Sequence, residues 1–142
     1  MTTPKYITEN FMLQEFVSRE FYEVHKHKSL WFIDERIVAT CQSLRDNLQI
    51  PLTINNWYWD GERNESGLRV PGMLNYSLYS QHTFGRAVDI ISKRMSAEDM
   101  RKHIFFNKDI YPHIKAVERN VDWLHIDCRN TNQADIMFFN PR

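Results

Sequence analysis

The chain has 142 residues, enough to bury one hydrophobic core and too few for a second, so we expect one domain over 1–142. Its 18 lysine and arginine residues balance 18 aspartate and glutamate residues, and the two signs are interspersed. This balance excludes the basic footprint that is typical of proteins binding nucleic acid or an anionic membrane. No segment is apolar enough to cross a bilayer, and the N-terminus lacks the basic and apolar regions of a signal peptide, so we expect synthesis in the cytoplasm. The two cysteines, Cys41 and Cys128, are interpreted as reduced structural thiols.

The N-terminal half contains helical patterns followed by a long irregular stretch. Aromatic packing residues over 9–24 favour one or two short helical pieces. Apolar residues recur at three- and four-residue steps over 33–48, which predicts an amphipathic helix. Pro51 introduces a short predicted strand at 52–55, and the stretch 56–79 shows no clear period. A loop of that length in a compact domain is more often functional than idle.

The C-terminal half favours strands. One strand is predicted at 86–91, and Ser96 with Asp99 marks the start of a helix that continues to about Phe106. Further strands are expected at 113–117, 123–128 and 136–139. Helices first and then strands, without regular alternation, predict an α+β fold in which a small antiparallel sheet is flanked by helices.

Three side chains in this half form a candidate metal-ligand set. His82 precedes a turn, Asp89 lies on the strand that follows it, and His125 lies on a later strand. Gly85, between the first two, permits a backbone conformation that could turn both side chains toward one point. Two imidazoles and one carboxylate suit zinc, and three protein ligands leave a position open for water, as catalytic zinc sites do.

An acid for proton transfer is expected beside these ligands. Asp122 lies three residues before His125 and could reach the metal as the base for its water. The strand period of two places Trp123, His125 and Asp127 on one face, so Asp127 could orient the imidazole of His125. Glu118 and Asp127 remain rivals to Asp122 for the role of catalytic acid, because the sequence does not show which one faces the metal.

Other histidines are left outside the site: His25, His27, His103 and His113. The first two alternate with lysines that repel a cation, and the last two lack a partner at ligand spacing. In a metal-free alternative, His82 and Asp89 only shape a turn.

The residues around the two ligand segments resemble a family of zinc peptidoglycan peptidases. The first segment matches the pattern Ser-x-His-x-x-Gly-x-Ala-x-Asp from Ser80 to Asp89, and the second matches a Trp-x-His-x-Asp pattern from Trp123 to Asp127. This family includes D-Ala-D-Ala carboxypeptidases and phage L-alanyl-D-glutamate endopeptidases, and the hedgehog signalling domain shares its fold. The resemblance covers most of the chain, because 11–16, the helix ending at Leu48 and 54–55 match the usual lead-in.

The resemblance also implies an arginine that binds the substrate. The family carries Ser-Gly-Tyr-Arg upstream of the first histidine, and this chain has Ser-Gly-Leu-Arg ending at Arg69. The segment 56–61 looks like an insertion before this motif, so Arg63 stays an alternative to Arg69. Dipeptidase-like members carry glutamate where this chain has Asp122, and aspartate at that place is similar to the phage endopeptidases.

The resemblance implies zinc-dependent hydrolysis of a peptide bond in bacterial peptidoglycan. In this interpretation His82, Asp89 and His125 hold Zn²⁺, Asp122 takes and returns the proton, and Arg69 steadies the oxyanion. The partner would be a peptidoglycan peptide, with no nucleic acid and no membrane insertion, and we expect a monomer. A small enzyme of this kind fits a phage or prophage lysis protein that acts on the cell wall after release or within a virion. As the hedgehog domain suggests, the alternative is a non-catalytic zinc-binding module of a phage structure or of a partner complex.

Overall fold

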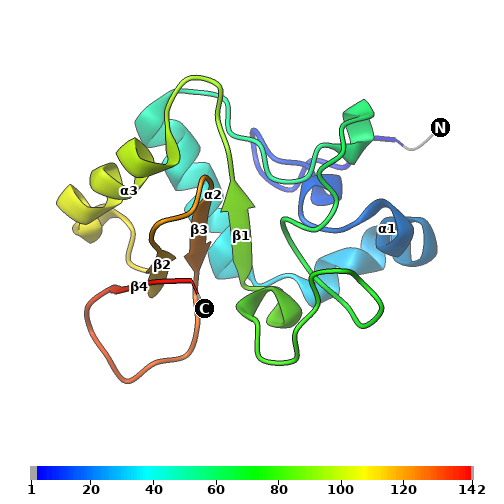
Figure 1. The fold of residues 1–142 in the computed structure, drawn as a ribbon. Coiled ribbons are helices and arrows are strands. Elements are labelled where there is room, and N and C mark those ends of the chain that lie inside the picture. The colour runs from blue at the N-terminus through cyan, green and yellow to red at the C-terminus, as the bar shows by residue number, and fades with distance from the viewer. Residues whose placement is uncertain (1–2, 142) are drawn as a thin grey trace.

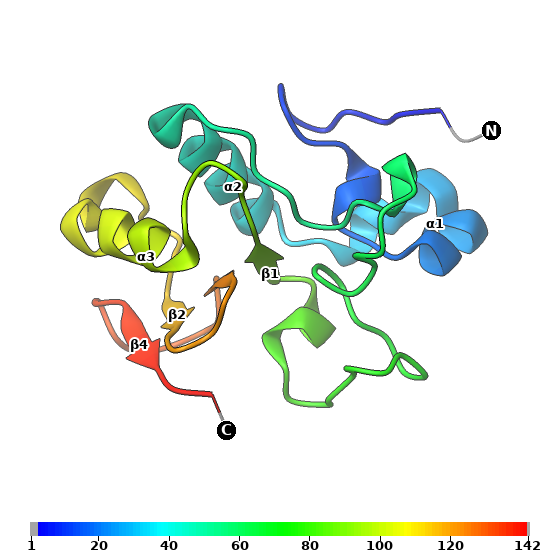
Figure 2. The ribbon, with the colours of Figure 1, turned by 45° about the horizontal axis from the view of Figure 1, so that its top comes forward.

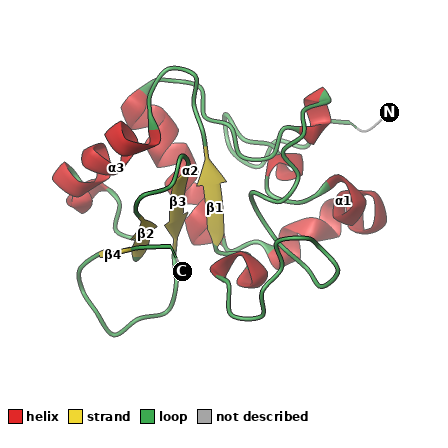
Figure 3. Cartoon of the chain, in the orientation of Figure 1, coloured by secondary structure: helices red, strands yellow, loops and turns green. Residues whose placement is uncertain are grey.

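The computed structural model describes residues 3–141 (Figure 1), and within them it contains helices, a small sheet and long connecting loops. The α-helices are α1 (Arg19–His25), α2 (Glu35–Leu48) and α3 (Ala97–Phe106). The strands are β1 (Ala87–Ile90), β2 (Ala116–Glu118), β3 (Leu124–Asp127) and β4 (Met137–Phe139). Short 3-10 turns occupy Leu13–Glu15 (η1), Lys26–Phe32 (η2), Trp57–Trp59 (η3), Gln81–Phe84 (η4) and Lys108–Ile110 (η5) (Figure 3). The predicted α+β composition is confirmed. Within 3–141, no helix combines the length and the apolar character that crossing a membrane requires.

The sheet is mixed, whereas the sequence predicted an antiparallel one. Its strand order is β1-β3-β2-β4, with β3 antiparallel to both neighbours and β4 parallel to β2. Both edges of β3 are occupied by β1 and β2, so the chain leaving β3 can pair only with an outer strand. The loop 128–136 reverses the chain, and β4 therefore runs in the direction of β2 (Figure 1).

The two faces of the sheet have different chemistry. Val88 and Ile90 of β1 lie opposite Ile126 and Leu124 of β3, and all four are buried in the hydrophobic core. Helix α2 lies against this face (Figures 1 and 2) and contributes Ile37, Cys41 and Leu44 to the same core. The alternate residues, Asp89 and His125, face the other way, so the sheet carries a polar site on the side opposite α2. Cys41 and Cys128 are both buried free thiols.

Local capping explains where the two longer helices begin. Helix α2 begins at Glu35, two residues later than predicted, because the Asp34 side chain caps it by accepting the Arg36 N–H. Helix α3 follows the prediction: Ser96 accepts the Asp99 N–H, and the helix ends at Phe106. The helical pieces predicted over 9–24 are η1 and α1, and η2 was not predicted.

Two predicted strands are shorter or differently placed. Only one residue of 52–55 pairs with the sheet, through a single bridge between Thr53 and Ile91. The strand predicted at 113–117 is wrong at its start, because the Ile114 N–H bonds the Tyr111 carbonyl in a turn and pairing with β3 begins at Ala116. The predicted terminal strand is confirmed as β4 at the edge of the sheet.

Candidate metal centre

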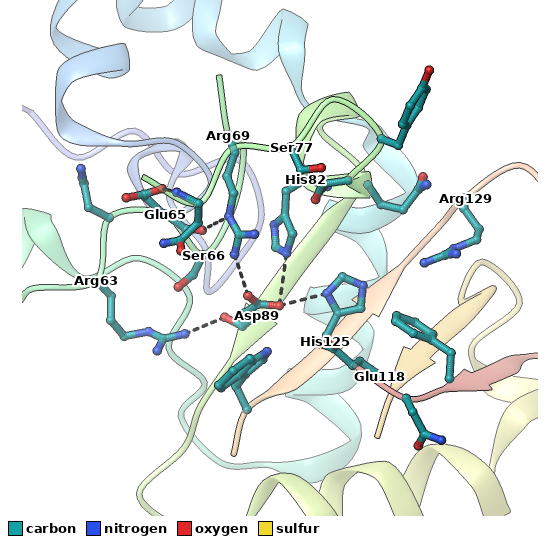
Figure 4. A pocket seen from close by; sticks show the side chains of 18 of the residues that line it. Arg63, Glu65, Ser66, Arg69, Ser77, His82, Asp89, Glu118, His125 and Arg129 are labelled. Atoms are coloured by element: carbon teal, nitrogen blue, oxygen red, sulfur yellow. Dashed lines mark hydrogen bonds and ion pairs between the residues drawn. The ribbon is translucent and has the colours of Figure 1, made fainter. Parts of the chain in front are cut away.

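The three residues predicted as ligands lie together at one point. His82 comes from η4, Asp89 from β1 and His125 from β3, and their potential ligand atoms all lie within 4.8 Å of one another (Figure 4). All three side chains are buried. Buried polar side chains must be hydrogen-bonded, paired with an opposite charge or bound to a metal ion. This cluster is therefore a candidate metal centre.

Sheet register and one turn bring the ligands together. Asp89 and His125 are direct partners across the β1–β3 pair. His82 is held in η4, where the Ser80 hydroxyl accepts the His82 main-chain N–H and Gly85 ends the turn with φ at +69°. That left-handed conformation, which suits glycine, folds His82 back over the strand that carries Asp89.

Hydrogen bonds define which nitrogen of each imidazole faces the centre. His82 Nδ1 donates to the Gly67 carbonyl at 2.8 Å, and His125 Nε2 donates to Asp127 Oδ2 at 2.7 Å. The opposite nitrogens, His82 Nε2 and His125 Nδ1, lie 3.2 and 3.0 Å from Asp89 Oδ1. In these tautomers, which follow from the bonding partners, lone pairs of two imidazoles and a carboxylate converge. Such a set needs a cation between its members, and each imidazole carries the outer hydrogen bond typical of a metal ligand.

The charges of these groups depend strongly on one another. Burial disfavours the ionised Asp89 carboxyl, but His82 and His125 outweigh burial and hold the pKa of Asp89 well below its usual range. Burial also opposes protonation of His125, whereas its hydrogen bonds to Asp127 and Asp89 raise its pKa to about 9. Without a metal, a proton therefore occupies the place of the cation at neutral pH.

The two candidate arginines have different surroundings (Figure 4). Arg69 Nη2 donates to Asp89 Oδ2 at 3.0 Å, and its Nε donates to the Glu65 carbonyl at 2.7 Å. Arg63 instead donates to main-chain carbonyls, from Nε to Ile54 and from Nη2 to Asp89. Arg69 therefore contacts the ligand carboxylate, while Arg63 ties the loop before it to β1.

Two of the candidate acids, Glu118 and Asp122, line different hollows, and the turn between β2 and β3 separates them. The structure does not bring Asp122 to the ligands: it is exposed and lines a second hollow together with Arg101. Arg101 donates to the carbonyls of Val121 and Trp123 on either side of Asp122, which holds this part of the turn toward α3. Asp122 lies in the bend before β3, outside the strand that carries His125.

Glu118, a rival to Asp122, lies on the same side of the sheet as His125. The pairing of Ala116 with Asp127 and of Val117 with Ile126 continues to place Glu118 opposite His125. Directly opposed residues of antiparallel strands share a face at about 5 Å between their Cα atoms. Glu118 and His125 accordingly line the same cleft.

The centre forms part of the wall of an open cleft of about 980 Å³. The loop 62–82 forms one side, and β4 with the residues after β3 forms the other. Trp123 and Phe139 add aromatic surface, and Ser77, Ser80 and Asn75 add hydrogen-bonding groups. This lining can hold an extended polar chain against the ligands.

Arg129 is a cleft residue that sequence reasoning missed. Its guanidinium donates two hydrogen bonds to the Asp127 carboxylate, from Nε at 2.8 Å and from Nη2 at 2.7 Å. The signal was the strand alternation itself, since continuing the period of two from His125 through Asp127 reaches Arg129.

No family model, curated protein or solved structure matches the chain. The resemblance to zinc peptidases therefore depends on the two sequence motifs alone.

Proposed function

We propose that this protein is a zinc-dependent hydrolase that cleaves a peptide bond in the stem peptides of bacterial peptidoglycan. The observation that carries the proposal is the convergence of the His82, Asp89 and His125 lone pairs in an open cleft, beside Arg69 and Glu118. The substrate class comes from the motif resemblance, and the cleft's mixture of aromatic and hydrogen-bonding groups suits a peptide.

The donor set suits zinc in kind and in number. His82 would bind through Nε2, His125 through Nδ1 and Asp89 through Oδ1, the atoms that face one another. Zinc held in this way would supply a Lewis acid for a carbonyl group and would lower the pKa of a water molecule to near neutrality. Gly67 and Asp127 keep both imidazoles in the tautomers that this binding requires.

Glu118 is assigned the proton transfers that the sequence had attributed to Asp122. Its carboxylate accepts a proton from the attacking water and delivers it to the departing amine nitrogen. Its place opposite His125 supports this role, because a general base must lie within hydrogen-bonding reach of the water beside the ligands.

Arg69 is assigned the role of binding the carbonyl oxygen of the substrate. Nε and Nη2 are engaged with Glu65 and Asp89, which holds the guanidinium plane at the centre. The Nη1 group then donates to the carbonyl oxygen as negative charge develops on it. Donors of this kind contribute about two to three powers of ten in rate.

Mass spectrometry of purified peptidoglycan tests the proposal. Zinc-loaded wild-type protein should create new peptide termini, and these identify the cleaved bond. Glu118→Gln should keep zinc and lower the rate by about 10²–10⁴-fold, the usual contribution of a general base. Asp122→Asn is the matched control, since it removes a carboxylate from the other hollow, and it should cleave at the wild-type rate.

Each contrary result has a definite meaning. No new termini from wild-type protein that contains one zinc per chain would refute the peptidase and favour a non-catalytic zinc-binding module. A loss in Asp122→Asn as large as in Glu118→Gln would return the base to Asp122 and require the turn to move during catalysis.

A further inference from the structure

Arg129, Asp127 and His125 are linked by hydrogen bonds beside the candidate centre. Asp127 Oδ1 accepts from the main-chain N–H and Nε of Arg129 at 3.2 and 2.8 Å, and Oδ2 accepts from Nη2 at 2.7 Å. The same Oδ2 accepts from His125 Nε2 at 2.7 Å. The guanidinium also lies over the Phe139 ring, 5.0 Å from its centre.

The Asp127 carboxylate depends on these partners. Its side chain has no exposed surface, so an unpaired charge there would be costly. Arg129 and His125 hold both carboxylate oxygens from two directions, and this leaves the carboxylate one orientation. The plane of the carboxylate in turn determines where Nε2 of His125 must point.

We propose that Arg129 is a positioning residue of the metal centre, which acts through Asp127 to orient His125 so that Nδ1 faces Asp89. This inference rests on the proposed zinc site. It assigns Arg129 no contact with substrate, and it predicts that Arg129 controls the affinity for zinc.

Whether removal of Arg129 strengthens or weakens zinc binding distinguishes a positioning role from a direct electrostatic one. A guanidinium cation repels a divalent cation, so removing it would strengthen zinc binding if Arg129 acted through its charge alone. If Arg129 acts by orienting the ligand through Asp127, removing it must weaken zinc binding.

The chain contains a matched control for this contact. Arg36 bonds Asp34, two residues before it, through the same three groups: its main-chain N–H, Nε and Nη2, at 2.9, 3.0 and 2.7 Å. Asp34 caps α2. Arg36→Met therefore removes the same kind of ion pair at the start of α2, from a carboxylate that bonds neither ligand histidine.

Competition with a chromophoric chelator measures zinc affinity in each variant. Arg129→Met should bind zinc about tenfold more weakly than wild type, the lower end of the range for residues that support a metal ligand. Arg36→Met should stay within about twofold of wild type. If Arg129 acts through the Asp127 carboxylate, Arg129→Met should cause no further loss of zinc affinity in a protein that already carries Asp127→Asn. Thermal melts verify that each variant is folded.

Proton NMR of the cobalt-loaded protein provides a second measurement, because it compares the exchange of the two ligand-histidine N–H protons within the same protein. In Arg129→Met, exchange of the His125 Nε2–H with water should accelerate, while that of the His82 Nδ1–H, bonded to Gly67, should not change. Wild-type affinity and unchanged exchange in Arg129→Met would overturn the role of Arg129 alone. A wild-type protein that binds neither zinc nor cobalt would overturn the zinc site as well.

Discussion

Gly85 joins the fold to the candidate centre, and its replacement by alanine should disrupt both. Gly85 adopts φ of +69°, its N–H closes η4, and its carbonyl accepts the Asp34 N–H at the start of α2. A Cβ at this position would overlap the main-chain carbonyl oxygen of Phe32. The left-handed backbone costs an alanine about 1–2 kcal/mol, and relieving an overlap in a packed region costs about 1–3 kcal/mol more. Gly85→Ala should therefore lose about 2–5 kcal/mol in the free energy of unfolding.

Gly72 separates the two contributions. It also has positive φ, at +98°, but a Cβ there would meet nothing within 4 Å. Gly72→Ala should lose only the backbone cost, about 1–2 kcal/mol. Urea unfolding of the metal-free proteins measures the free energy of unfolding of wild type, Gly85→Ala and Gly72→Ala. Zinc titration should show weaker binding only for Gly85→Ala, because η4 carries His82. Equal losses in the two variants would refute the reasoning that contact with Phe32 requires glycine at position 85.

Three further predictions concern the turn, the pH dependence and the metal. Arg101→Met should lower the free energy of unfolding by about 2–4 kcal/mol, because the carbonyls of Val121 and Trp123 lose a buried charged donor; a loss in urea unfolding below about 1 kcal/mol would contradict this. The pKa of His125 is raised from 6.5 to about 9 in the folded protein, so its stabilising effect is complete below pH 6.5 and is lost as pH rises through 9. Urea unfolding should show this loss in metal-free wild type and not in His125→Gln. Zinc at a hundredfold excess over its dissociation constant should stabilise the protein by about 2.7 kcal/mol, as measured by melting with and without a chelator. Asp89→Asn should abolish that difference, and a persisting difference would place the zinc elsewhere.

Much of the local structure was predictable from short-range patterns. The Ser96 cap and the apolar periodicity of 33–48 predicted α3 and most of α2, because caps and helix faces depend on residues a few positions apart. The alternation around His125 correctly placed Asp127 beside it and Leu124 in the core. The grouping of His82, Asp89 and His125 was expected from the same kind of reasoning, and their binding of zinc remains a prediction.

The choice between Glu118 and Asp122 shows where such patterns end. Asp122 is nearer to His125 in sequence, but it lies in the bend before β3, where Arg101 binds the carbonyls on either side of it. Glu118 is seven residues away, and the β2–β3 register places it opposite His125. Register depends on pairing between strands, which neither strand specifies alone.

The sequence by itself determined the chemistry available to this protein: two imidazoles and a carboxylate at turn and strand positions, with a strand period that separates them from the core. Only the tertiary structure decided which arginine bonds the Asp89 carboxylate, which acid shares a cleft with His125, that β4 runs parallel to β2, and that Arg129 bonds Asp127. The reason is physical. Backbone periodicity and capping act over a few residues, whereas these outcomes depend on contacts between segments that meet only when the sheet forms.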